Sequence, residues 1–177
     1  MKKVLRNDIQ LEITQGDIVK QPDVDAIVNA ANAWLKPGGG VAGAIHRAAG
    51  PELEQECRQY APIKPGQAVM TKGYRLPNLY VIHVLGPVYS QDQSEDTLLA
   101  NCYRHALLLA DEKGLRNIAF PAISTGAFGY PLPEAAHFAL QAVHEVAARL
   151  NAVRLIRFVL FDKVAVEAFQ HALEDIS

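Results

Sequence analysis

The stretch "VNAANAWLKPGGGVAGAIHRAAG", residues 28–50, places two asparagines and three consecutive glycines between an apolar run and a short helical pattern. Glycine has no side chain, so a glycine run lets another group approach the backbone closely. At the start of a helix the exposed N–H groups also carry the positive end of the helix dipole, which suits a phosphate. The stretch therefore predicts a strand, an anion-binding loop and a helix, in that order.

A second glycine-rich segment, "STGAFGYP" at residues 124–131, directly follows the apolar run that ends at Ile123. In open α/β sheets, ligands bind where loops and helix N-termini meet at the carboxyl ends of the strands. Either loop alone is explained equally well by a tight turn. Together, two such loops on strand ends predict a site that holds one diphosphate from both sides.

Strand and helix patterns alternate through the chain, which predicts a mixed α/β sheet covered by helices on both faces. The strand-like segments are 11–14, 25–30, 67–74, 79–86, 117–123 and 155–161. Helical periodicity is clearest from Ser94 to Lys113, with further helices expected after Glu134 and after Asp162. The short connection at 75–78 suits a hairpin. We expect one domain spanning residues 1–177.

Composition favours an ordinary globular protein. Half of the residues are hydrophobic and the formal net charge is −2, which gives no reason to expect nucleic-acid or membrane binding. The first residues lack the apolar core of a signal peptide, and no window approaches the roughly 18 apolar residues of a membrane span, so we expect a cytoplasmic protein. Cys57 and Cys102 lie among helical residues and are expected to be buried thiols.

Other chemistries have weaker support. Gly38, Gly40 and Gly43 satisfy the dinucleotide pattern GxGxxG, but "NAANAWLKP" separates them from the strand, and no Gly-Lys-Ser/Thr of a nucleotide triphosphatase loop follows. Ser124 lacks the first glycine of a GxSxG nucleophile motif, so we expect it to hydrogen-bond an anion instead. No histidine pair has metal-ligand spacing, and we expect no metal and no cofactor.

Two single residues, His46 and Asp17, each allow a structural and a functional interpretation. His46 in "AGAIHRAAG" is either a structural hydrogen-bonding residue or a catalytic side chain that faces the glycine loop. Asp17 in "QGDIV" is either a turn cap or an acceptor for the exocyclic amino group of a base. Phe161 and Asp162, at the end of the last predicted strand, are expected to be a core residue and a helix N-cap.

The segments "GDIV", "DAIVNAAN", "GGGVAGAIHRAAG", "VIHVLGP" and "AFPAISTGAFGYP" occur in an order and spacing that resemble the macrodomain family of ADP-ribose-binding modules. The resemblance extends from about Ile9 to Phe169. It implies a three-layer α/β/α sandwich around a six-stranded mixed sheet, and a monomer whose partner is ADP-ribose or an ADP-ribosylated protein.

The resemblance also implies a ligand site. Its expected members are Asp17, Ile18, Asn32, Gly38, Gly39, Gly40, Val41, Ser124, Thr125, Gly126, Ala127, Phe128, Gly129 and Phe161. By this resemblance Asp17 accepts from the adenine amino group, Ile18 and Phe161 line the adenine pocket, and the glycines hold the diphosphate. Asn32 hydrogen-bonds the distal ribose, whereas Asn29 is structural.

The resemblance allows two kinds of function, because macrodomains include both hydrolases and pure binding modules. The bacterial deacetylase type carries an aspartate where this chain has Ala42, so that general base is missing. "GGGVAGA" is similar to viral macrodomains, which are associated with removing ADP-ribose from acidic side chains without that aspartate, although Pro37 replaces their usual histidine. We therefore expect either an ADP-ribosyl ester hydrolase, with Asn32 and His46 as catalytic candidates, or a reader without turnover.

Overall fold

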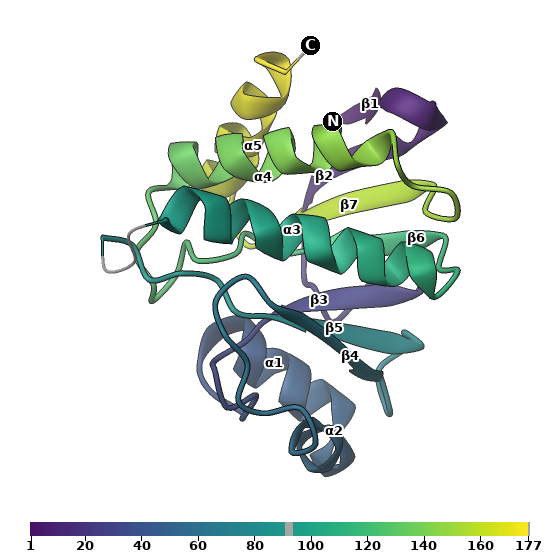
Figure 1. Ribbon diagram of the computed structural model, residues 1–177, viewed down its shortest axis with the longest axis vertical. Helices are drawn as coiled ribbons and strands as arrows, with labels where there is room; N and C mark the ends of the chain where they lie inside the picture. The colour runs from purple at the N-terminus through teal and green to yellow at the C-terminus, as the bar shows by residue number, and fades with distance from the viewer. Residues whose placement is uncertain (91–93, 177) are drawn as a thin grey trace.

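A mixed seven-stranded sheet lies between two helical layers in the computed structural model, which describes residues 1–90 and 94–176 (Figure 1). The elements in chain order are β1 (Lys2–Val4), the 3-10 turn η1 (Arg6–Asp8), β2 (Gln10–Gln15), β3 (Ala26–Ala30), α1 (Gly40–Ala49), α2 (Pro51–Cys57), β4 (Ala68–Lys72), β5 (Tyr80–Val84), α3 (Glu95–Glu112), β6 (Asn117–Phe120), α4 (Leu132–Ala147), β7 (Leu155–Leu160) and α5 (Lys163–Glu174). The expected three-layer α/β/α class is confirmed.

The strand order is β1-β2-β7-β6-β3-β5-β4, and the pairs from β2 to β5 are all parallel. The edge strands β1 and β4 are antiparallel to their neighbours, so the expected β4–β5 hairpin is confirmed. The expected strand count of six was wrong by one. The additional strand, β1, has only three mostly exposed residues, too few to produce an alternating pattern.

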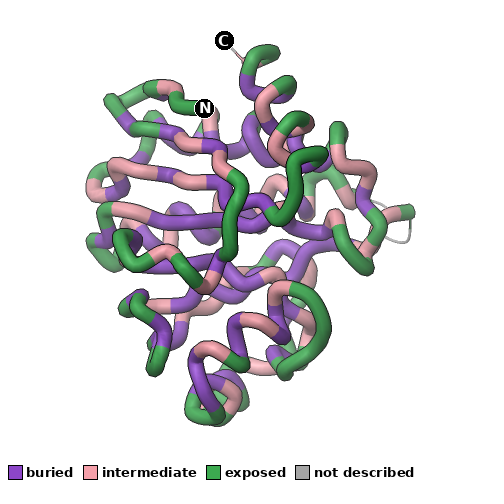
Figure 2. The backbone as a smooth tube through the Cα atoms, turned by 180° about the vertical axis from the view of Figure 1, so that it is seen from behind, coloured by how far each residue is buried: buried purple, intermediate pink, exposed green. Residues whose placement is uncertain are grey.

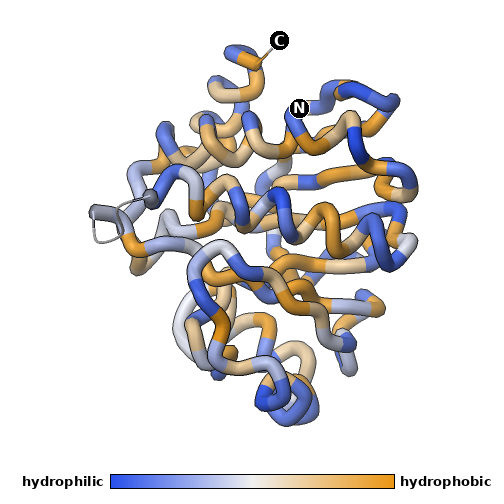
Figure 3. The backbone as a smooth tube through the Cα atoms, viewed as in Figure 1, coloured by the Kyte–Doolittle hydropathy of each residue, from blue (hydrophilic) through white to orange (hydrophobic). Residues whose placement is uncertain are grey.

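Side chains of the central strands alternate between two cores. On β3, Ala26 and Val28 belong to the core beneath α3, α4 and α5, whereas Ile27 belongs to the core beneath α1 and α2. Figure 2 shows the buried backbone concentrated in these strands, and Figure 3 shows hydrophobic residues following them. Such a strand is buried on both faces, which explains its nearly continuous apolar sequence.

The helices follow their sequence signals closely. Helix α3 starts after Ser94 and ends before Lys113, as predicted. Asp162 caps α5 by accepting a hydrogen bond from Ala165 N at 2.9 Å. Both cysteines are buried and free, as expected. In the described part of the chain, no helix is long and apolar enough to cross a membrane.

Because β2, β7, β6, β3 and β5 run parallel, their carboxyl ends lie along one edge of the sheet. The register pairs Gln15 at the end of β2 with Leu160 at the end of β7. The segments that follow these strands hold the site residues expected from the sequence. The fold therefore brings residues from 17 to 161 to a common edge.

Candidate ligand-binding site

The N-terminus of α1 offers backbone donors that nothing in the described chain satisfies. Its N-cap residue, Gly39, has no side chain to accept them, and the first turn contains no acidic residue. The first helical backbone bond there is Gly43 N to Gly39 O, at 3.3 Å. The N–H groups of Gly40, Val41 and Ala42 therefore remain available to an anion at the positive end of the helix dipole.

The glycine loop folds tightly onto this helix. A Cβ on Gly43 would lie 2.2 Å from the carbonyl oxygen of Gly38, so only glycine allows this approach. Gly40 adopts a φ of +57°, which favours glycine, whereas a Cβ on Gly39 would meet nothing within 4 Å. The outer side of the loop is thus open to a ligand.

The second loop, residues 124–129, also presents backbone donors. Ser124 Oγ donates to Pro87 O at 2.8 Å and Thr125 Oγ1 donates to Ala122 O at 2.9 Å. Ser124 is only 6% exposed and has a φ of +68°. Its hydroxyl hydrogen is therefore committed to Pro87 O, and the expected role of Ser124 in binding an anion stays a prediction. Such a strained residue is held by its surroundings and is typical of ligand-binding turns.

Three backbone hydrogen bonds fix the shape of this second loop. Gly129 N donates to Gly126 O at 3.0 Å, Tyr130 N to Ser124 O at 2.9 Å, and Tyr89 N to Phe128 O at 2.9 Å. Within residues 1–90 and 94–176, no acceptor is found for the N–H groups of residues 125–128. The loop is rigid in form yet has free donors at its tip, where Gly126 and Ala127 are exposed.

Asn32 shapes the loop between β3 and the glycines. Its Nδ2 donates to Lys36 O at 2.8 Å, and its Oδ1 accepts from Lys36 N at 3.0 Å. A Cβ on Gly38 would lie 3.5 Å from Asn32 Nδ2, so the amide stands beside the glycine run. One amide hydrogen and one oxygen lone pair remain for a ligand. Leu35 anchors the loop in the core, whereas Trp34 is 61% exposed.

Asp17 and Phe161 follow the paired strands β2 and β7 at the other end of the site. Asp17 is exposed, and its Oδ1 accepts from Val19 N at 3.1 Å, which is the turn cap considered above. The second carboxylate oxygen remains free for a ligand. Ile18 is buried behind it, whereas Phe161 is 91% exposed. The expectation that Phe161 is a core residue was therefore wrong.

His46 is one of the buried residues of α1. It is 6% exposed, and burial lowers the pKa of its imidazole, so the ring is neutral at physiological pH. Neither ring nitrogen has a hydrogen-bond partner among the described residues. The catalytic interpretation of His46 thus gains no support from the geometry.

A buried polar cluster lies beneath α1 and α2. Asn29 is fully buried, and its Nδ2 lies 3.0 Å from His83 Nδ1, while Thr71 Oγ1 lies 2.8 Å from His83 Nε2. Burial, and then the field of His46, lower the pKa of His83 to about 3. Asn29 therefore makes its contact inside the protein, which agrees with its expected structural role.

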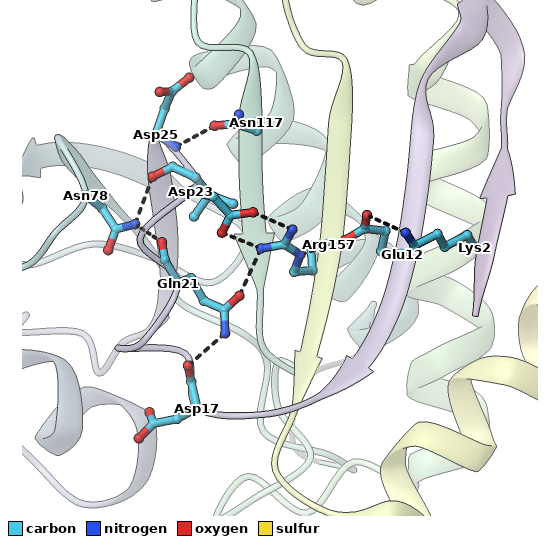
Figure 4. A network of polar contacts seen from close by, with 10 residues as sticks. Lys2, Glu12, Asp17, Gln21, Asp23, Asp25, Asn78, Asn117 and Arg157 are labelled. Atoms are coloured by element: carbon cyan, nitrogen blue, oxygen red, sulfur yellow. Dashed lines mark hydrogen bonds and ion pairs between the residues drawn. The ribbon is translucent and has the colours of Figure 1, made fainter.

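Three further residues support the site, although sequence reasoning did not single them out. A Cβ on Gly86 would lie 2.1 Å from Ser124 Oγ, so Gly86 makes room for that side chain. Gln21 and Arg157 form a polar network beside Asp17 (Figure 4). Arg157 had a detectable signal, because it is the only charged residue within the apolar segment "LIRFVLF".

The donor set suits an anionic ligand, because its free groups are backbone N–H donors. In the part of the chain that the structure describes, no three His, Cys, Asp or Glu side chains are grouped to hold a metal ion. Two sets of free backbone N–H groups lie between an exposed aromatic ring with a carboxylate on one side and an amide on the other. Free backbone N–H groups of this kind suit a ligand that carries phosphate groups.

Comparison with known proteins agrees with this chemistry. Residues 28–139 match the Macro domain family. A macro domain-containing protein of Chlorobaculum tepidum is 50% identical over 151 residues, covering 85% of this chain and 88% of that protein. A macro domain-containing protein of Methanosarcina mazei is 46% identical over 168 residues, covering 94% and 89%.

Solved structures are similar over almost the whole chain. The Oceanobacillus iheyensis macrodomain with ADP is 42% identical, has a TM-score of 0.94, and covers 99% of this chain and 95% of its own. The Trypanosoma brucei macrodomain in complex with ADP-ribose is 38% identical, with a TM-score of 0.86 and coverage of 92% and 68%.

Proposed function

Because this chain belongs to the macrodomain family, we propose that it binds ADP-ribose along the carboxyl edge of the sheet and hydrolyses ADP-ribose esters. The observation that carries the proposal is the pair of backbone donor loops at the α1 N-terminus and at residues 124–129. Two such loops at the ends of β3 and β6 suit the two phosphates of one diphosphate.

The order of subsites follows the strand order. The edge presents Asp17 and Phe161 after β2 and β7, then the 124–129 loop after β6, then Asn32 and the glycines after β3. ADP-ribose laid along this edge places adenine between Asp17 and Phe161, the diphosphate between the loops, and the distal ribose at Asn32. The exposed Phe161 ring offers adenine an apolar face, and the free Asp17 oxygen accepts from its amino group.

Hydrolysis would add water to the ester and release a carboxylic acid and free ADP-ribose. The substrates we propose are mono-ADP-ribosylated Asp or Glu side chains of proteins, or O-acetyl-ADP-ribose. Ala42 supplies no general base, so acceleration would come from positioning and from backbone dipoles that stabilise developing negative charge. Asn32, whose amide is already fixed by Lys36, would orient the distal ribose and the attacking water.

A reader without turnover is the second candidate, and Ala42 is the observation that favours it. Ala42 lies in the first turn of α1 and is 5% exposed, and that turn contains no carboxylate. The same binding site would then recognise ADP-ribose on a protein without releasing it.

The test is to incubate the protein with a substrate that is mono-ADP-ribosylated on glutamate, beside its Asn32→Ala variant, and to measure free ADP-ribose. The hydrolase proposal predicts release above the rate without enzyme, and a large loss of that rate in Asn32→Ala. Tight ADP-ribose binding without any release would identify a reader.

Ala42→Asp separates the two functions further, with Ala44→Asp as its matched control. The control adds the same charge to α1, two residues further along, where it faces another side of the helix. A reader should gain activity only from Ala42→Asp. A wild-type rate equal to that of Ala42→Asp would contradict the reader.

A further inference from the structure

We propose that Gln21 and Arg157 are positioning residues for adenine recognition, because they tie the backbone of Asp17 to the centre of the sheet. The inference rests on the proposed function, since it takes Asp17 as the acceptor for the adenine amino group. It concerns the loop from Gly16 to Asp25, which runs from the ligand edge back to the start of β3.

Gln21 is the link between Asp17 and the sheet (Figure 4). Its Nε2 donates to the carbonyl oxygen of Asp17 at 3.0 Å, and its Oε1 accepts from Arg157 Nη1 at 3.0 Å. The same carbonyl accepts from Lys20 N at 3.0 Å, a bond within the turn. The turn therefore closes by itself, and among the described residues only Gln21 attaches this carbonyl to β7.

Arg157 holds the side chain of Gln21, and is itself held in place by two carboxylates. Its side chain is 13% exposed, and its guanidinium donates to both carboxylate oxygens of Asp23, at 2.8 and 2.7 Å. Its Nε donates to Glu12 at 2.7 Å on the neighbouring strand β2. A planar guanidinium held in this way by two carboxylates has little freedom to move. Hydrogen bonding to Arg157 lowers the pKa of Asp23, so the pair stays charged at physiological pH.

Asn78 holds the same loop from its other side. This residue is 3% exposed, and its Nδ2 donates to the carbonyl oxygens of Gln21 and Val24, at 2.7 and 2.8 Å. The loop is thus clamped on both sides at Gln21. Gln21 thus holds Asp17 from within the loop, and the backbone bond from Gly16 N to Leu160 O, at 2.9 Å, holds it from the end of β2.

This rigidity has a specific use. A hydrogen bond to one base requires its acceptor at a defined place, and it loses strength steeply when the distance or angle changes. Hypoxanthine has no exocyclic amino group, so a correctly placed Asp17 should favour ADP-ribose over inosine diphosphate ribose. The ratio of these two affinities reports the position of Asp17, whereas general damage to the protein weakens both ligands together.

The test uses Gln21→Glu, which keeps the acceptor for Arg157 and removes the donor to Asp17. Calorimetric titration with both ligands should show the affinity ratio falling by about five-fold, the equivalent of one hydrogen bond. The added charge can repel both diphosphates, but it acts on them equally. Arg157→Lys, which loses the planar fork, should lower the ratio by a smaller factor.

Two controls complete the experiment. Asp111→Asn weakens a loop at the opposite end of the sheet and should lower stability without changing the ratio. Lys2→Ala removes the outermost, 82% exposed member of the network and should change neither.

The outcomes separate the inference from the proposed function. An unchanged ratio in Gln21→Glu, with the ratio lost in Asp17→Ala, would overturn the positioning role and leave ADP-ribose recognition intact. Equal affinities for both ligands in the wild type would overturn the inference, because Asp17 would then not recognise the adenine amino group. A wild type that binds neither ligand would overturn both proposals.

Discussion

The loops at the two ends of the sheet differ in whether their backbone N–H groups have acceptors. At the amino ends of the strands, the carboxylate of Asp111 accepts from the N–H groups of Asn151, Ala152 and Val153, with its Oδ1 at 2.9, 2.6 and 3.0 Å. At the carboxyl ends, the N–H groups at the start of α1 and at residues 125–128 have no acceptor within the described residues.

Asp25 repeats the pattern at the amino end. Its Oδ2 accepts from Arg116 N at 2.9 Å and its carbonyl oxygen from Tyr80 N at 3.2 Å, so one residue joins the starts of three strands. The loops at the two ends thus serve different purposes. Side chains that satisfy the backbone stabilise one end, whereas glycines that leave donors free prepare the other for a ligand.

The largest effect should come from Gly43→Ala at the ligand end. The new Cβ would meet Gly38 O at 2.2 Å, so the glycine loop must move. We expect the affinity for ADP-ribose to fall at least about ten-fold and the free energy of unfolding by about 1 to 3 kcal/mol. Calorimetry and denaturant unfolding measure the two quantities.

Gly114→Ala is the matched control at the amino end. Gly114 has a φ of +82°, and a Cβ there would meet nothing within 4 Å. The strain should cost about 1 kcal/mol of stability and leave ADP-ribose binding unchanged. A loss of affinity comparable to that of Gly43→Ala would break the distinction between the two ends.

Asp111→Asn tests the amino end of the sheet, where side chains satisfy the backbone N–H groups. Because the carboxylate serves three backbone donors, the substitution should lower the free energy of unfolding by about 1 to 3 kcal/mol. ADP-ribose affinity, measured well below the melting temperature, should stay at the wild-type value. A stable variant with weakened binding would show that the ends are coupled.

The pH dependence of stability provides a smaller signal at the same place. Burial alone would raise the pKa of Asp111, but hydrogen bonds from three backbone N–H groups outweigh it and hold the pKa below its ordinary value of 3.8. A lowered folded-state pKa contributes stability above pH 3.8 that is lost as pH falls through the folded value. Wild type should therefore lose more stability than Asp111→Asn between pH 5 and pH 2, as urea unfolding would measure. Parallel curves would contradict this.

The smallest effect is spectroscopic. Trp34 is the only tryptophan, is 61% exposed, and lies two residues after Asn32. ADP-ribose should change its fluorescence, and Trp34→Phe should remove the signal while changing stability by less than about 0.5 kcal/mol. Unchanged fluorescence during binding that calorimetry detects would place the ligand away from Asn32.

Local patterns were enough to predict most of this architecture. The strands and helices around residues 28–50 and 117–147 carry strong periodicity and clear boundaries, and both glycine loops lie at the expected strand ends. The three-residue strand β1 was not predicted, because it is too short to show an alternating pattern. Side-chain direction was harder, since only neighbours from distant segments turn the Ser124 hydroxyl toward Pro87 and bury His46.

The hydrogen-bond network of Gln21 and Arg157 could not be predicted from the sequence, for a different reason. Gln21 and Arg157 are 136 residues apart, and nothing in either local segment specifies the other. A single sequence shows that a charge lies inside an apolar strand, which indicates that it is paired, but it does not identify the partner. Only the parallel pairing of β2 and β7 brings Arg157 under the Asp17 loop.

The most direct test of the proposed binding mode is a crystal structure of the protein soaked with ADP-ribose. The diphosphate should lie within hydrogen-bond distance of N–H groups from both the α1 N-terminus and residues 125–128, with adenine at Asp17 and Phe161 and the distal ribose at Asn32. A diphosphate bound anywhere else, with these N–H groups unoccupied, would contradict it.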